Sequence, residues 1–127
     1  VYDRLLHADE IMSRIERYYK PYHAALTDLL NTAYYNFGQV WHLNCHSMPS
    51  SSARPRQVMQ MDGYHARNAD FVLGDRDGTT CDLNFTHAVR DFLRGLGYHV
   101  CINDPFKGAE LIERYSAPAR GRHSLQI

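Results

Sequence analysis

The chain has 127 residues and a mass of 14.7 kDa, with 14 basic and 14 acidic residues and a hydrophobic fraction of 44%. This size fits one domain, and the balanced charge argues against the broad positive field that binds nucleic acid. The sequence contains neither an apolar run of about 20 residues nor the layout of a signal peptide, so we expect a cytoplasmic protein without a membrane span.

The three cysteines, Cys45, Cys81 and Cys101, form no C-x-x-C pair. An odd count without that spacing argues against a disulfide framework and a zinc ribbon, and it predicts reduced, mostly buried thiols. The chain begins at Val1 and ends on the apolar stretch of RGRHSLQI, so both ends look cut. We therefore expect residues 1–127 to be a single-domain portion of a larger domain.

An amphipathic helix is predicted from Ile11 onward. Its apolar positions follow steps of three and four, which predicts a buried face made of Ile15, Tyr18, Tyr22, Leu26, Leu29 and Ala33. Pro21 lacks a backbone donor and disfavours helical geometry at the preceding residue, so we expect a kink or two consecutive helices. Gly38 is a suitable C-terminal stop.

A short strand is predicted over residues 39–45, QVWHLNC. Alternation along a strand predicts two faces, the first made of Trp41, Leu43 and Cys45 and the second of His42, Asn44 and His46. We expect Cys45 to turn inward as a packing residue. Residues 47–69 form a loop longer than ordinary connections, and loops of that length are often functional.

The second half of the chain predicts three more strands, over residues 70–75, 98–102 and 123–127. Between the first two, Asp82 caps a helix whose apolar face is made of Phe85, Val89, Phe92, Leu93 and Leu96. This order of helices and strands predicts an α/β fold, with three α/β/α layers and a mostly parallel or mixed central sheet.

Polar side chains follow three of the predicted strands. In chain order they are His46 and Ser47, then Asp75, Arg76 and Asp77, then Asn103, Asp104 and Lys107. Ligands of open α/β sheets bind at the carboxyl ends of the strands, where such side chains converge. The three strand ends therefore predict a concave polar site.

His46 is a candidate metal ligand, a candidate general base, or a histidine whose ring is satisfied by a carbonyl. A catalytic zinc needs three protein ligands, and His7 and Glu10 in HADE stand at the H-x-x-E spacing that could complete such a set. The same pair is typical of a helix start, because acidic side chains favour the positive end of the helix dipole. Helix capping is the favoured interpretation of His7 and Glu10.

Nucleophilic chemistry has weaker support in the sequence. Cys45 would need an imidazole, and His46 points to the opposite side of the strand, so a core thiol is favoured. Ser47 has His46 and His123 as candidate bases but lacks the G-x-S-x-G elbow that presents a serine. Three more histidines are interpreted without a functional role: His42 and His87 as core residues, and His65, in the long loop, as solvated.

Arg76 stands between two aspartates in the sequence GDRDG. Its planar guanidinium suits a carboxylate ligand, because it can form two parallel hydrogen bonds with one. The spacing alone slightly favours local pairing with Asp75 or Asp77, and both interpretations stay open.

Four segments of the chain resemble, in order, the N-formylglutamate amidohydrolase family, also called N-formylglutamate deformylase. They are NCHSMPS (44–50), DFVLGDRDGTTCD (70–82), GYHVCINDPFKGAELIERY (97–115) and GRHSLQI (121–127). The segment IERYYKPYHAAL also resembles the stretch that precedes the C-H-S-M-P motif of that family. The resemblance therefore covers nearly the whole chain.

This resemblance implies a metal-dependent hydrolase of the zinc-carboxypeptidase-like (phosphorylase/hydrolase-like) fold. The family cleaves the formamide bond of N-formyl-L-glutamate to give formate and L-glutamate in histidine degradation, so the implied partner is a small acidic N-acyl amino acid. On this resemblance His46 is expected to bind a divalent metal, zinc. By position, Arg76 and Asn103 are predicted to hold the substrate's carboxylates, and His123 to line the pocket.

The chain also departs from the family pattern. Members usually begin with a strand ending in P-H-S-G, which supplies a first metal histidine, followed by a D-x-D element and later a D-L-N-R element, and this opening stretch is expected to lie before Val1. The catalytic carboxylate is expected to be a glutamate beyond Ile127, so we expect the chain alone to be inactive. The alternatives are a metal-free binding or structural member of the same fold, or a related zinc peptidase or amidase.

Overall fold

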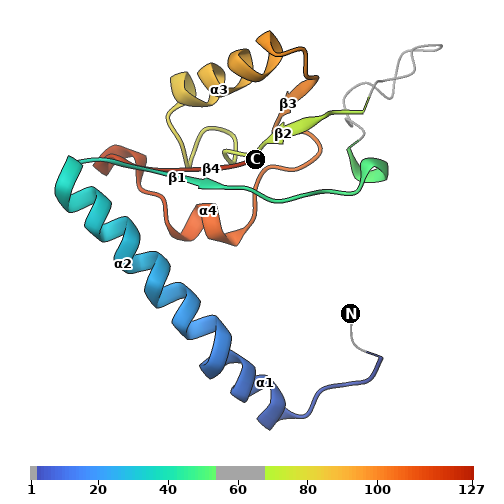
Figure 1. The fold of residues 1–127 in the computed structure, drawn as a ribbon, viewed down its shortest axis with the longest axis vertical. Helices are drawn as coiled ribbons and strands as arrows, with labels where there is room; N and C mark the ends of the chain where they lie inside the picture. The colour runs from blue at the N-terminus through green and yellow to red at the C-terminus, as the bar shows by residue number, and fades with distance from the viewer. Residues whose placement is uncertain (1–2, 54–67) are drawn as a thin grey trace.

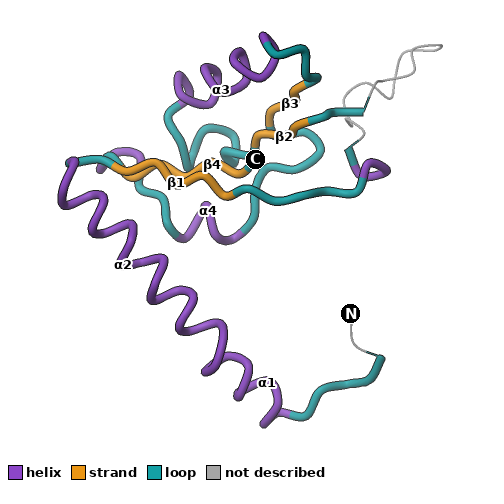
Figure 2. The backbone as a smooth tube through the Cα atoms, viewed as in Figure 1, coloured by secondary structure: helices purple, strands orange, loops and turns teal. Residues whose placement is uncertain are grey.

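The computed structural model describes residues 3–53 and 68–127 (Figure 1). These residues form a mixed α/β fold whose strands pair in two small parallel sheets (Figure 2). In one sheet β1 (Val40–Asn44) pairs with β4 (Arg122–Gln126), and in the other β2 (Phe71–Leu73) pairs with β3 (Val100–Ile102). All four predicted strands are therefore confirmed, with small shifts at their ends.

The two sheets meet at an antiparallel bridge between Gly74 and Gln126. The backbone N–H of each residue donates to the carbonyl of the other, both at 2.9 Å. The β2–β3 pair thus runs against the β1–β4 pair, and the strand arrangement is mixed. As a result, the carboxyl ends of β2 and β4 lie side by side at this bridge, and the two strands point in opposite directions.

The N-terminal helix is one long rod in three sections, α1 (Ala8–Arg14), the π-helical turn η1 (Ile15–Tyr19) and α2 (Lys20–Phe37). In η1 the backbone N–H of Lys20 donates to the carbonyl of Ile15, one residue further back than in an α-helix. Pro21 is the second residue of α2, so the helix continues through it, and the predicted kink or pair of helices takes the form of the π-turn that ends at Tyr19. Gly38 ends α2 in the left-handed conformation, at φ 71°, as predicted.

The predicted buried face of this helix is only partly right. His23 and Leu30 are the buried residues of α2, and three predicted members, Ile15, Leu26 and Ala33, are half-buried. The other predicted members, Tyr18, Tyr22 and Leu29, are exposed. The physical reason is that the rod projects away from the strands and touches them through α2, so its apolar stripe is covered over part of its length (Figure 1).

Helix α3 (Leu83–Gly95) begins at Asp82, whose carboxylate accepts hydrogen bonds from the backbone N–H groups of Asn84 and Phe85 at 2.8 and 3.1 Å. This confirms the predicted N-cap. The core cluster joins both sheets and α3, and its buried members and the α3 residues packed on them are Leu73, Cys81, Val100, Leu125, Phe85, Val89 and Leu93. Phe92 and Leu96 are exposed, so the predicted apolar face of this helix was too wide.

Helix α4 (Glu110–Arg114) lies on the side of the strands opposite α3 (Figure 1), with Ile112 fully buried. This helix and two 3₁₀ turns, Ser50–Ser52 and Pro118–Arg120, are not predicted from the sequence, because each is too short to show a helical repeat. Helices thus flank the strands on both sides. None of the helices in the described residues combines the length and apolar character needed to cross a membrane.

Candidate active site at the strand ends

His46 lies where β1 and β4 end together. Its backbone N–H donates to the carbonyl of Ile127 at 2.9 Å, and the backbone N–H of Ile127 donates to the carbonyl of Asn44 at 3.0 Å. These bonds continue the parallel pairing one step beyond the strands, so the backbone of His46 is held in place. The imidazole itself is exposed, and its Nδ1 lies 3.2 Å from Oδ1 of Asn44.

The contact with Asn44 orients the imidazole. Because an amide oxygen only accepts, this contact is a hydrogen bond in the tautomer with the proton on Nδ1, and in that tautomer Nε2 keeps its lone pair. Metal-binding histidines commonly have their second ring nitrogen fixed in this way by an oxygen acceptor. The geometry therefore fits a single metal ligand at His46.

The part of the chain that the structure describes brings no complete metal-binding set together. Across residues 3–53 and 68–127, no three His, Cys, Asp or Glu side chains are grouped closely enough to hold an ion. His7 and Glu10 serve the helix start instead: the Glu10 carboxylate accepts from the backbone N–H of His7 at 3.1 Å and forms two hydrogen bonds with Arg4. The hydrogen bonds from Arg4, and then that from His7, lower the pKa of Glu10. The capping interpretation of HADE is thus confirmed.

The two faces of β1 alternate as predicted, but the more buried face is the other one. Trp41 and Leu43 are 37% and 47% exposed, and Cys45 is exposed, whereas His42 and Asn44 are half-buried. The prediction that Cys45 packs inward is therefore wrong. The reason is that the half-buried face is the one that meets Ser124 of β4, whose hydroxyl lies 2.6 Å from Nδ1 of His42.

The other cysteines and histidines divide by position. Cys81 is buried, Cys101 is half-buried and all three thiols are free, in line with the prediction of reduced cysteines. Burial lowers the pKa of His42, in keeping with its predicted place inside the sheet. His87 is exposed on α3, so its predicted core role is wrong, and His65 lies outside the described residues.

A hollow of about 800 Å³ opens beside His46, between the ends of β1 and β4 and the start of β2. It is lined by residues 45–50, Ala53, residues 69–72, Phe106 and residues 126–127. The lining therefore combines apolar residues with polar ones, which include His46, Ser47, Asp70 and Gln126. This mixture is typical of sites for small molecules.

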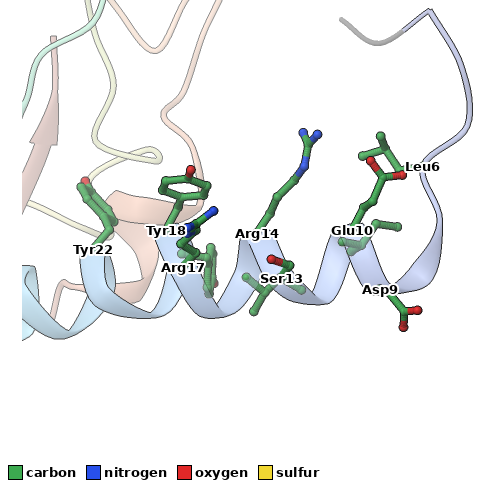
Figure 3. Close-up of a pocket in the computed structure, with 11 residues that line it drawn as sticks. Leu6, Asp9, Glu10, Ser13, Arg14, Arg17, Tyr18 and Tyr22 are labelled. Atoms are coloured by element: carbon green, nitrogen blue, oxygen red, sulfur yellow. The ribbon is translucent and has the colours of Figure 1, made fainter.

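A larger hollow, of about 1330 Å³, runs along the N-terminal helix (Figure 3). All of its lining side chains belong to residues 6–22, and Figure 3 shows them spread along the helical rod, with Leu6 in the segment directly before it. A surface bordered by a single helix encloses nothing. We therefore place the candidate site at His46.

Arg76 follows β2 and contacts the loop after β3. Its guanidinium forms an ion pair with Glu113 of α4 at 3.1 Å and donates to the carbonyl of Gly108 at 3.4 Å. The predicted local pairing with a flanking aspartate is wrong, because Asp77 instead pairs with Lys107 at 2.7 Å. The backbone of Arg76 is left-handed, with φ 51°.

Asn103 is bonded to Asp75, the first residue after Gly74. Its amide Nδ2 donates to Oδ1 of Asp75 at 2.6 Å, and its Oδ1 accepts from the backbone N–H of Asp75 at 3.0 Å. Asp75 was identified in the sequence only as one polar strand-end residue among several. The signal that could have singled it out is its place directly after a glycine at a strand end, where the chain must turn.

His123 lies at the other end of β4, opposite Trp41 in the strand register. Its ring stacks on Trp41 with centroids 4.0 Å apart, and Nδ1 accepts from the backbone N–H of Asp82 at 3.2 Å. The structure therefore brings Arg76 and Asn103 to one side of the Gly74–Gln126 bridge and leaves His123 among packing contacts. None of these three residues is part of the wall of the hollow beside His46.

Two further residues connect the hollow with the loop after β3. Gln126 lines the hollow, and its side-chain Oε1 accepts from the backbone N–H of Ala109 at 2.9 Å. Gly74 lies so close to this loop that a Cβ there would be 2.7 Å from the backbone N of Gly108. Gly108 lies in the segment 97–115 that resembles the family, but its close approach to Gly74 was not evident from the sequence.

Comparisons with known proteins agree on one family. The family model described as N-formylglutamate amidohydrolase matches residues 1–127. The chain is 27% identical over 114 residues to an N-formylglutamate deformylase of Pseudomonas putida, covering 89% of this chain and 40% of that protein. It is 26% identical over 121 residues to an N-formylglutamate deformylase of Pseudomonas aeruginosa, covering 94% of this chain and 42% of that protein.

A solved structure gives the same relationship. The crystal structure of an N-formylglutamate amidohydrolase from Ralstonia eutropha JMP134 superposes with a TM-score of 0.84 and is 49% identical in sequence, covering 99% of this chain and 44% of that chain. The chain therefore spans about two fifths of the length of the relatives that it matches.

Proposed function

This chain belongs to the N-formylglutamate amidohydrolase family, and from that premise we propose that the protein hydrolyses the formamide bond of N-formyl-L-glutamate, or of a similar N-acyl amino acid, to formate and the free amino acid. The observation that carries the proposal is the family match over the whole chain. The structure adds an oriented imidazole, His46, beside a hollow large enough for a small molecule. By the same kinship we propose a zinc-carboxypeptidase-like three-layer fold and a cytoplasmic location.

We propose that zinc is the cofactor and that His46 holds it through Nε2. A zinc ion would polarise the formyl carbonyl and lower the pKa of a bound water. His46 supports this role because its Nδ1 is engaged by Asn44 and its ring is exposed beside the hollow. The described residues hold no three-ligand metal set, so we propose that the remaining ligands and the catalytic glutamate lie elsewhere and that the 127-residue chain by itself releases no formate.

We propose that Arg76 binds a carboxylate of the substrate. Its guanidinium already holds a carboxylate, that of Glu113, whose side chain is 60% exposed and so can be exchanged for a ligand. Asn103 and His123 stay predicted substrate-binding residues with less support. The amide of Asn103 is bonded to Asp75, and Nδ1 of His123 accepts from the backbone of Asp82.

The test measures zinc content and formate release on N-formyl-L-glutamate by the protein as its gene encodes it. We expect about one zinc per protein and formate release, and His46→Ala should lose both. His87→Ala, on the exposed side of α3, is the matched control and should retain both. Stoichiometric zinc without formate release would contradict the proposed substrate but not the proposed zinc site.

A second measurement addresses Arg76. Arg76→Ala should raise KM for the acidic substrate by about tenfold to a hundredfold, because a charged hydrogen bond to the carboxylate is lost. Arg17→Ala, on the N-terminal rod, is the control for removing one positive charge. An unchanged KM in Arg76→Ala would remove this residue from the site.

The alternative is a metal-free binding or structural member of the same family. It is favoured by one observation, that the described residues hold no three-ligand metal set. Absence of both zinc and formate release from the gene-encoded protein would decide for this alternative.

A further inference from the structure

Asp75 is a fully buried aspartate at the point where β2 ends. Its Oδ1 accepts from Nδ2 of Asn103 at 2.6 Å and from the backbone N–H of Gly78 at 2.9 Å. Its Oδ2 is buried and has no partner in the described part of the chain. A buried carboxylate with one unpartnered oxygen costs stability, which points to a role for Asp75 other than stabilising the fold.

The backbone N–H and carbonyl of Asp75 are also hydrogen-bonded. Its carbonyl accepts from the N–H groups of Thr79 at 3.0 Å and Thr80 at 3.1 Å, and its own N–H donates to Oδ1 of Asn103 at 3.0 Å. These bonds tie the turn of residues 75–80 to the loop after β3. Asp75 therefore holds the turn closed, because it accepts hydrogen bonds from Gly78, Thr79 and Thr80.

The turn that Asp75 closes has a strained backbone. Arg76, Asp77 and Gly78 follow one another with φ of 51°, 58° and 80°. Left-handed geometry is unfavourable for residues other than glycine and persists only where the surroundings impose it. The bonds that hold it here are those of Asp75 and two sets at Arg76. The backbone N–H of Arg76 donates to the carbonyl of Lys107 at 2.9 Å, and the carbonyl of Arg76 accepts from the hydroxyl and the backbone N–H of Thr79 at 2.7 and 3.3 Å.

We propose that Asp75 is the positioning residue for Arg76, acting with Asn103 to hold its backbone left-handed so that the guanidinium faces α4 and Gly108 rather than the flanking aspartates. This inference rests on the proposed role of Arg76 in binding a substrate carboxylate. It gives Asp75 a part in specificity for acidic substrates without any contact to the substrate. It also gives Asn103 an indirect role, as the partner that fixes Asp75.

The test uses the gene-encoded protein and variants that separate geometry from charge. Asp75→Ala removes the accepting oxygen, while the conservative Asp75→Asn keeps Oδ1 as the acceptor for both Gly78 and Asn103. Asn103→Gly removes the amide and tolerates the left-handed φ of 56° at that position, so it serves if Asp75→Ala fails to fold. Asp28→Ala, on exposed α2, controls for the loss of an aspartate.

We expect Asp75→Ala to raise KM for N-formyl-L-glutamate as Arg76→Ala does, by about tenfold to a hundredfold, with a smaller change in kcat. Asp75→Asn should recover most of that loss. In the Arg76→Ala background, Asp75→Ala should have no further effect on KM, because the group that it positions is gone. Effects on KM that add in the double variant would overturn the inference.

Amide hydrogen exchange gives a second result that does not depend on activity. The backbone N–H groups of Arg76 and Gly78 should exchange slowly in the wild type and fast in Asp75→Ala or Asn103→Gly, with the strands unchanged. If the wild type releases no formate, the proposed function fails, and exchange alone decides on Asp75. Equal exchange of these two amides in wild type and variants would overturn the positioning role.

Discussion

Replacing Gly74 by alanine tests the contact that joins the two sheets. A Cβ at this position would lie 2.7 Å from the backbone N of Gly108 and the backbone C of Lys107, and 2.9 Å from the carbonyl O of Lys107. These are backbone atoms, so no side chain can rotate out of the way. The loop after β3 must therefore move, or the bridge between Gly74 and Gln126 must break.

The expected loss of stability follows from these contacts. Overpacking of this kind costs about 1–3 kcal/mol. Each of the two bridge hydrogen bonds, if broken, adds about 0.5–1.5 kcal/mol. The free energy of unfolding should fall by about 2–6 kcal/mol, a large share of the roughly 5–15 kcal/mol of an ordinary domain.

The measurement is urea unfolding followed by circular dichroism, with Gly95→Ala as the matched control. Gly95 ends α3 with open space around it, so an added methyl group there meets no atom within 4 Å. Both variants restrict the unfolded chain equally, which cancels that contribution in the comparison. Gly95→Ala should gain up to about 1 kcal/mol. A Gly74→Ala midpoint equal to that of the wild type would refute the close approach of the two backbones.

Three further outcomes are expected. Asp82→Ala should destabilise α3 by about 1 kcal/mol through loss of its cap, seen as a lower urea midpoint, while Asp82→Asn should keep most of the cap. Burial lowers the pKa of His42 below its ordinary value of 6.5, so the stability from its neutral form is present above that value and is lost as the pH falls through the lowered pKa. Urea midpoints should therefore drop on acidification in the wild type, and less so in His42→Phe. Iodoacetamide at about pH 8 should modify exposed Cys45 in the native protein, whereas burial raises the pKa of Cys81 to about 11 and should protect it until the chain unfolds, as peptide mass spectrometry would show. Native labelling of Cys81 as fast as that of Cys45 would contradict its burial.

The sequence by itself determined the local features of this protein. The strand near residues 39–45, the stop at Gly38, the cap at Asp82 and the interruption at Pro21 all depend on neighbours within a few residues, and all four were predicted. The order of its motifs also identified the family, because that pattern is written along the chain itself.

Only the tertiary structure decided which face of β1 is covered and which partner each polar side chain takes. Arg76 pairs with Glu113 rather than with an adjacent aspartate, and Asp75 is held by Asn103, a residue 28 positions away. The prediction that Cys45 packs inward failed because alternation defines two faces and does not say which one another element covers. These pairings depend on the antiparallel bridge between Gly74 and Gln126, which sets β2 beside β4. The spacing of residues along the chain carries no information about contacts between segments that are far apart in sequence.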